Sequence, residues 1–143
     1  MGFPKEFTYE EMIVSQTAAR HGISNAPDKA ALQNLMVTAN AMLKVRSLLG
    51  NKPIIVSSGY RSPAVNAKVG GKNNSAHTLG WAVDFTCPGF GTPLEVAKAI
   101  AASDLKYDQL IHEYDVWVHI SFDPRLRQQD LTINSSGTKP GLH

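Results

Sequence analysis

The sequence predicts a single α+β domain. Helix signals with a period near 3.6 residues fill most of the first third of the chain, and short β-branched or alternating apolar runs recur after it. No internal repeat and no linker divides the 143 residues. With 43% hydrophobic and 18% charged residues, a chain of this length can bury one core without disulfides.

Helix signals predict four helices, at about 8–20, 27–50, 63–69 and 92–102. Thr8 with Glu11 and Thr92 with Glu95 both match the S/T-x-x-E capping box that opens a helix. The second helix carries apolar residues at i, i+3, i+4 and i+7 spacing, and Gly50 provides its C-terminal stop. The chain is therefore expected to contribute one long helix and three shorter ones.

Four strands are expected, at about 54–58, 81–85, 107–113 and 116–122. Tyr114 and Asp115 lie between the last two and predict a tight turn that pairs them as a hairpin. The segment from Pro124 onward is polar and is expected to be peripheral. The single domain, 1–143, would then have its core at about 7–122 and a polar tail at 124–143.

Charge and hydropathy exclude two classes of partner. A formal charge of +2 and a pI near 8.7 give no strong field of one sign, so no nucleic-acid partner is suggested. No run approaches the ~18 apolar residues of a membrane span. The N-terminus also lacks the basic and apolar regions of a signal peptide. The expectation is a monomer that is synthesised in the cytoplasm.

Two segments contain residues that could bind zinc. SAHTLGWAVDF, at 75–85, contains His77 and Asp84, and WVHISF, at 117–122, contains His119. A catalytic zinc ion takes three His or carboxylate ligands and keeps an open position for water. Gly80 permits a sharp turn between the first two ligands, and separate strands could bring all three to one sheet face. Spacing alone leaves a second interpretation open, in which the histidine is a core residue and the aspartate caps a turn.

The joint pattern of motifs resembles a known family. The matching segments are SGYRSP at 58–63, S-x-H-x-x-G-x-A-x-D from Ser75 to Asp84, and WVH ending at His119. They resemble the zinc D-Ala-D-Ala carboxypeptidases and L-alanyl-D-glutamate endopeptidases, which share a fold with the hedgehog signalling domain. The resemblance covers roughly 7–122 and is greatest to the compact branch found in phage endolysins and prophage-encoded wall peptidases.

This resemblance implies a small mixed or antiparallel sheet flanked by helices, with zinc held by His77, Asp84 and His119. It also implies hydrolysis of peptide bonds in bacterial peptidoglycan, so the protein would act at the cell wall and something else would have to deliver it there. Arg61 would bind a substrate carboxylate, for which a planar, bidentate guanidinium is suited. Ser75 would hydrogen-bond substrate or orient a ligand. Arg61 taken alone could equally be a surface or structural ion-pair residue.

The base that accepts a proton from the attacking water is less obvious. Many relatives carry a carboxylate three residues before the last histidine, and here that position is Val116. Glu113 and Asp115 are the candidates, and the predicted turn would fold the strand of Glu113 back beside that of His119. Aspartate is expected in a turn for local hydrogen bonding, and compact relatives carry a glutamate at the position of Glu113. We therefore favour Glu113, with Asp115 as the alternative. His112 should point to the opposite face of its strand.

Two other functions remain open at this point. A module of the same fold could retain zinc and bind wall peptides without catalysis, an interpretation that Val116 favours. Cys87 could instead act as the nucleophile of a thiol hydrolase, although a lone cysteine at an apolar strand end usually packs as a small hydrophobe. The sequence also leaves open which peptide bond would be cut.

Overall fold

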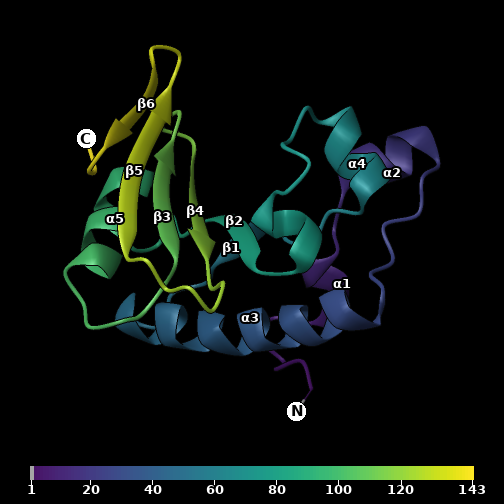
Figure 1. Cartoon of the computed structure of the whole chain (residues 1–143). Helices are drawn as coiled ribbons and strands as arrows, with labels where there is room; N and C mark the ends of the chain where they lie inside the picture. Colours follow the sequence, from purple (N-terminus) through teal and green to yellow (C-terminus); the bar gives the residue numbers. More distant parts are fainter. Residues whose placement is uncertain (1) are drawn as a thin grey trace.

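A six-stranded mixed sheet is the centre of the computed structural model, which describes residues 2–143 (Figure 1). Its strands are β1 (Ile55–Ser58), β2 (Ala82–Thr86), β3 (Gln109–Glu113), β4 (Trp117–Ser121), β5 (Gln129–Asn134) and β6 (Gly137–Pro140). The strand order is β1-β2-β4-β3-β5-β6. Every pair is antiparallel except β3 with β5, which is parallel. The predicted α+β domain with a mixed sheet is confirmed.

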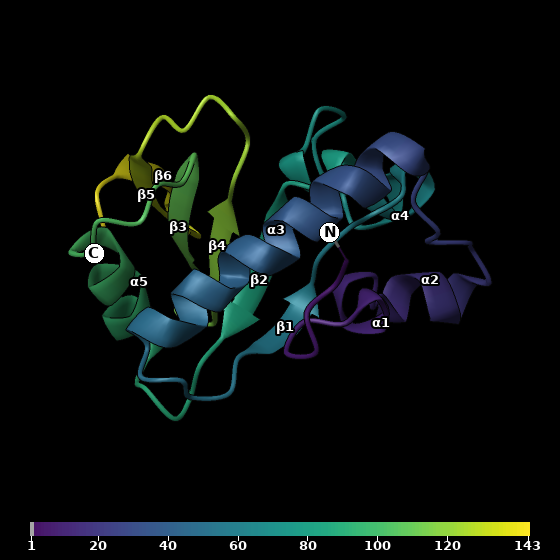
Figure 2. The same ribbon diagram turned by 90° about the horizontal axis from the view of Figure 1, so that it is seen from below.

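Helices cover one side of this sheet and extend beyond it. They are α1 (Tyr9–Met12), α2 (Gln16–His21), α3 (Lys29–Leu48), α4 (Pro63–Lys68), the 3-10 helix η1 (Ala76–Leu79) and α5 (Pro93–Ala101). Figure 1 shows α3 running beneath both the sheet and the small helices, and Figure 2, seen from below, shows it crossing in front of them. One long helix thus joins the two parts of the fold. Across residues 2–143, no helix is both long and apolar enough to cross a membrane.

The hydrophobic core lies between the sheet and the helices α3 and α5. The strands contribute fully buried side chains, among them Val83, Phe85, Val118 and Ile120. Because side chains alternate along a strand, the residues between them face the other way. The opposite face of β2 and β4 therefore carries Asp84 and His119, which are direct partners in the ladder. Core packing on one face thus fixes polar side chains on the other.

The predicted helix at 8–20 is wrong as a single element, because the chain forms α1 and α2 with a break between them. Ser15 is the N-cap of α2, and its hydroxyl accepts the Ala18 N–H at 3.0 Å. On the other side of the break, the Met12 carbonyl accepts the Tyr60 N–H at 2.8 Å, and the Ile13 carbonyl accepts the Asn25 side chain at 2.8 Å. Tertiary partners replace the helical hydrogen bonds that a continuous helix would make. The later capping box of Thr92 is present as predicted.

The C-terminal segment belongs to the sheet, so the expectation of a peripheral polar tail at 124–143 is wrong. β5 pairs in parallel with β3, and β6 pairs with β5. The connection before β5 is anchored by Arg127, whose guanidinium donates two hydrogen bonds to the buried Asp108 carboxylate at 2.8 and 2.9 Å. The alternation in QDLTIN, at 129–134, is weak because polar residues occupy most of its positions, so polarity concealed a strand.

Candidate active site

His77, Asp84 and His119 form a buried cluster on the sheet face opposite the core. Asp84 Oδ1 lies 3.2 Å from His77 Nε2 and 3.0 Å from His119 Nδ1. One nitrogen or oxygen atom from each residue lies within 4.8 Å of the others. Two imidazoles and one carboxylate are the donor set of a three-ligand zinc site, which leaves a fourth position for water. The residues therefore fit a zinc ion.

His77 is held in place by contacts that leave one ring nitrogen available. Its Nδ1 lies 2.7 Å from the Gly59 carbonyl and donates to it, while Nε2 faces Asp84 Oδ1 and is the nitrogen that would bind a metal ion. The Ser75 hydroxyl accepts the His77 N–H at 3.2 Å and caps η1. A backbone carbonyl that fixes the tautomer of a histidine is typical of metal sites. This role of Gly59 was not predicted from the sequence, although the residue lies within the SGYRSP segment.

Gly80 is required where the loop from η1 turns into β2. Its φ of +85° lies in the left-handed region, and a Cβ there would lie 2.5 Å from the Ala31 carbonyl oxygen on α3. Two α3 side chains hold the loop at this close approach: Asn34 donates to the Leu79 carbonyl at 2.8 Å and Thr38 to the Gly80 carbonyl at 2.7 Å. The predicted sharp turn is confirmed, and the loop that carries His77 is attached to the longest helix.

Asp84 is an ionised carboxylate. Burial by itself raises its pKa, but the charges of His77 and His119 and the hydrogen bonds from their rings outweigh burial and hold the pKa well below its usual range. A carboxylate that keeps its charge in a buried position between two imidazoles is suited to bind a cation.

Arg61 lies beside this cluster with unused hydrogen-bonding capacity. Its backbone N–H donates to the His77 carbonyl at 3.1 Å, and Nη2 lies 3.5 Å from the Ser75 hydroxyl. Its Nε is buried and has no hydrogen-bond partner among residues 2–143. Burial lowers the pKa of the guanidinium, whereas the charges of Asp84 and Glu113 raise it. The Arg61 guanidinium is thus available to an anionic group brought near the metal ligands.

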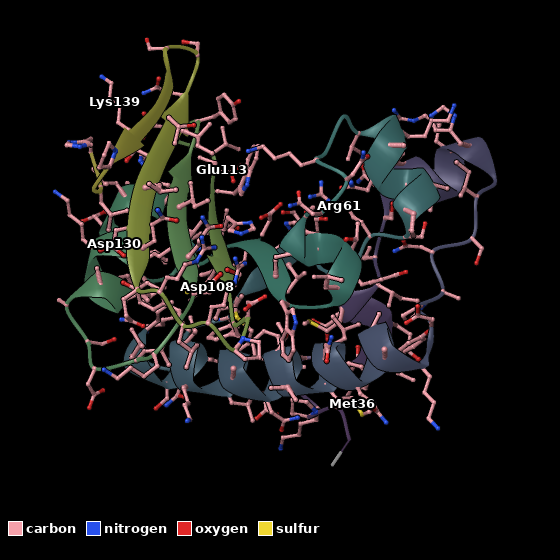
Figure 3. All side chains as sticks on the ribbon, viewed as in Figure 1. Met36, Arg61, Asp108, Glu113, Asp130 and Lys139 are labelled. Atoms are coloured by element: carbon pink, nitrogen blue, oxygen red, sulfur yellow. The ribbon has the colours of Figure 1, made fainter. Side chains whose placement is uncertain are left out.

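Glu113 ends β3 on the same face as the cluster. Its ladder partner is Trp117, which precedes His119 by two residues, so all three side chains share one face. Burial raises the pKa of Glu113 and the charge of Asp84 raises it further, while His119, Arg61 and Trp117 lower it. Figure 3 shows Glu113 on the sheet and Arg61 near η1, so the two residues come from different parts of the fold.

Trp117 is a residue whose role the sequence did not indicate. Its indole Nε1 is buried and reaches no hydrogen-bond partner among the described residues, even though the side chain is close enough to lower the pKa of Glu113. The available signal was its place two residues before His119 in WVH, which puts both residues on one strand face.

Asp115 points away from the cluster. It lies in the hairpin turn with a φ of 58°, its side chain is 86% exposed, and its Oδ1 is 2.9 Å from His112 Nε2. His112 pairs with Val118 on the core face, as expected for a residue adjacent to Glu113. The contact between His112 Nε2 and Asp115 Oδ1 is close but lacks hydrogen-bond geometry. Val116, also in the turn, is exposed.

Cys87 lies away from the ligand cluster and lacks the environment of a nucleophile. It is buried in the hydrophobic core, and burial raises the pKa of its thiol. Its Sγ contacts the Lys52 carbonyl at 3.8 Å. A thiol nucleophile needs a lowered pKa and an adjacent base, so this position does not favour the thiol-hydrolase interpretation.

Comparisons with known proteins place the chain in a peptidase family. The profile of the family described as Peptidase M15 matches residues 5–121, and the chain belongs to this family. The chain is also similar to the zinc D-Ala-D-Ala carboxypeptidase of Streptomyces albus G, with 33% identity over 108 residues. That match covers 76% of this chain and 40% of the relative, so the chain spans less than half the length of the curated relative. The predicted resemblance is confirmed at the level of the family.

Proposed function

We propose that this chain is a zinc-dependent peptidase that hydrolyses peptide bonds of bacterial peptidoglycan. The observation that carries the proposal is the buried group of His77, Asp84 and His119. Beside it lie a half-buried glutamate and the guanidinium of Arg61, whose buried Nε has no partner among residues 2–143. Membership of the M15 family and the name of the carboxypeptidase relative support the substrate class.

The chain's own residues have separate roles in this proposal. His77, Asp84 and His119 would hold zinc, which supplies an activated water and polarises the scissile carbonyl. Glu113 would accept a proton on its carboxylate from the attacking water and deliver it to the leaving amine. Its raised pKa supports this role, because a base whose pKa approaches the working pH can both take and release a proton.

Arg61 would hold the substrate in register for this proton transfer. A carboxylate of the peptide would accept two parallel hydrogen bonds from the guanidinium, whose buried Nε lacks a partner among residues 2–143. Ser75, 3.5 Å from Nη2, would orient the guanidinium while it caps η1. Asp115 remains the alternative base, but its exposure and its proximity to His112 favour a role in the turn.

We also propose that the protein is a compact lysin of phage or prophage type that acts on the wall as a monomer. The absence of an E-x-x-H carboxylate together with Glu113 in DQLIHEY supports this branch of the family. The rival is a zinc-containing module that binds wall peptides without cutting them. Glu113, which shares the ligand face with His119, favours the enzyme.

The test is hydrolysis of purified peptidoglycan by zinc-loaded protein, with and without a chelator. We expect new amino groups to appear, to stop on chelation and to return on adding zinc, and mass spectrometry of the fragments identifies the bond. Hydrolysis that continues after complete zinc removal would contradict the mechanism. Tight binding to the wall without any cleavage would favour the binding module.

A further inference from the structure

A groove of about 510 Å³ runs beside β1, at the edge of the sheet. Its walls are residues 14–17, which run from the α1–α2 connection into the start of α2, the strand residues 55–58, Arg61, Val65 of α4, and Val69 just after α4. It therefore shares Arg61 with the candidate active site, whose Asp84 and Glu113 influence the pKa of that guanidinium. The groove continues from the proposed carboxylate site along the sheet edge.

The register of β1 turns an apolar side chain toward this groove on the metal-binding face. Ile55 pairs with Thr86 and Ser58 pairs with Asp84, with a bulge between Val56 and Ser58 that allows both pairs to share a face. Ile55 is consequently on the face of Asp84 and is 56% exposed. Val14 and Val69, also exposed, extend the apolar wall on the helical side.

The outer edge of β1 has free backbone groups. β1 is the first strand in the sheet order and pairs only with β2. Apart from its pairing with β2, the backbone of 55–58 makes no hydrogen bond to the backbone of any other segment within residues 2–143. An exposed edge strand with apolar pockets beside it is the arrangement to which extended peptides add as an extra strand.

We propose that this groove binds an extended peptide segment that continues past the carboxylate held by Arg61 and adds to β1 as a strand. The protein would then cut upstream of several remaining residues instead of removing one C-terminal residue, because a substrate that ended at Arg61 would leave the groove unused. The four residues of β1 span roughly 13 Å, which suits about three or four substrate residues. This inference rests on the proposed peptidase function.

Three synthetic peptides test the inference with the zinc-loaded protein. The dipeptide L-Ala–D-Glu and the γ-linked tetrapeptide L-Ala–D-Glu–L-Lys–D-Ala share one scissile bond and one α-carboxylate for Arg61. A stem pentapeptide ending in D-Ala–D-Ala reports removal of a terminal residue. We expect kcat/KM for the shared bond to be at least about tenfold higher in the tetrapeptide, because the extension buries apolar surface and pairs with β1. N-methylation of the two extension residues should abolish this gain.

Matched variants locate the effect in the groove. Val14→Gln and Ile55→Gln should reduce the tetrapeptide advantage at least several-fold, mainly through KM. Val37→Gln is the control, since Val37 on α3 is 42% exposed, the same as Val14, and lies outside the groove. Equal rates for dipeptide and tetrapeptide, or release of only the terminal D-Ala, would overturn the inference while leaving the peptidase function intact.

A binding measurement separates failure of the inference from failure of the proposed function. The amide resonances of residues 55–58 in zinc-loaded Glu113→Gln should shift and gain protection from exchange with the tetrapeptide, but not with the dipeptide. If the parent protein hydrolyses no peptide and these shifts still occur, peptide binding in the groove is supported and the proposed peptidase function is contradicted. Unchanged resonances at 55–58 with a bound tetrapeptide would refute strand addition.

Discussion

Asp84 carries a buried negative charge between two imidazoles, and this arrangement makes each ligand dependent on the others. Removal of one histidine would leave the carboxylate less compensated and would reduce the ligand count from three to two. His119→Ala should therefore lose stoichiometric zinc, measured by elemental analysis after reloading. His21→Ala, an exposed histidine on α2, is the control and should retain one zinc per chain. Undiminished zinc in His119→Ala would remove His119 from the site.

We expect substitution of Glu113 to lower kcat, because Glu113 is the proposed base. Glu113→Gln keeps the shape and removes proton acceptance, so kcat should fall by ~10²–10⁴ while zinc content is unchanged. Asp115→Asn should cost little, because asparagine serves a turn with positive φ as well as aspartate does. The opposite ranking of the two variants would assign the base to Asp115.

The raised pKa of Glu113 also predicts a stability effect in the metal-free protein. Burial, together with the charge of Asp84, makes the folded state bind a proton more tightly than the unfolded chain does. Stability should therefore fall as pH rises from the ordinary range of a glutamate through the raised pKa. Chelator-treated Glu113→Gln should melt at a higher temperature than the parent at pH 7, and the difference should vanish below both pKa values. If the parent were as stable as Glu113→Gln at pH 7, ionisation of Glu113 would not destabilise the folded state.

Arg61 tests the geometry of substrate recognition. Arg61→Lys retains the charge but loses the planar fork, so it should weaken kcat/KM nearly as much as Arg61→Ala, by ~1.5–3 kcal/mol of transition-state binding. Rates measured on peptides with and without the recognised carboxylate check the assignment. Full activity of the lysine variant would show that a point charge is sufficient.

At the scale of elements, an ion pair between Arg127 and Asp108 anchors the segment that leads into the C-terminal strands. The Asp108 side chain is 2% exposed, and the hydrogen bonds from Arg127 lower the pKa of its carboxyl. The stabilisation should be complete above the ordinary pKa of an aspartate and should be lost as pH falls through the lowered one. Arg127→Ala should cost about 1–3 kcal/mol in urea unfolding at pH 7. The control, Arg125→Ala, removes a 62% exposed partner and should cost under about 1 kcal/mol.

Local signals explain which elements could be predicted. The capping box at Thr92 and the tight turn at 114–115 are encoded by neighbouring residues, so they were predictable from sequence. The break between α1 and α2 depends on Asn25 and Tyr60, which are distant in sequence, and β5 depends on pairing with β3. Of the candidate site, the three ligands were predictable from their residue types and motif, whereas the Gly59 carbonyl that fixes the His77 tautomer is visible only in three dimensions.

At the scale of the whole molecule, the C-terminal segment completes the sheet on the side that carries Glu113. Deletion of 123–143 would make β3 an edge strand and remove Arg125 and Arg127 from Asp108. We expect a large drop in the unfolding midpoint from loss of the β5 pairing, and aggregation through the exposed edge of β3. Deletion of 135–143 keeps β5 and the ion pair, and should be milder. A truncated chain as stable as the parent would mean that β5 contributes nothing to the fold.

The attachment of the Gly80 loop to α3 has a consequence for the affinity of the site for a metal ion. Asn34 and Thr38 hold the carbonyls of Leu79 and Gly80, shortly after His77, against α3 in contacts that involve no metal ligand. The loop is thus ordered by folding itself, and an arriving ion need not immobilise it. Because ordering a flexible segment subtracts from binding free energy, a preorganised loop favours high affinity and rapid loading. The long helix α3, remote from the chemistry, thereby contributes to the affinity of the site that it supports.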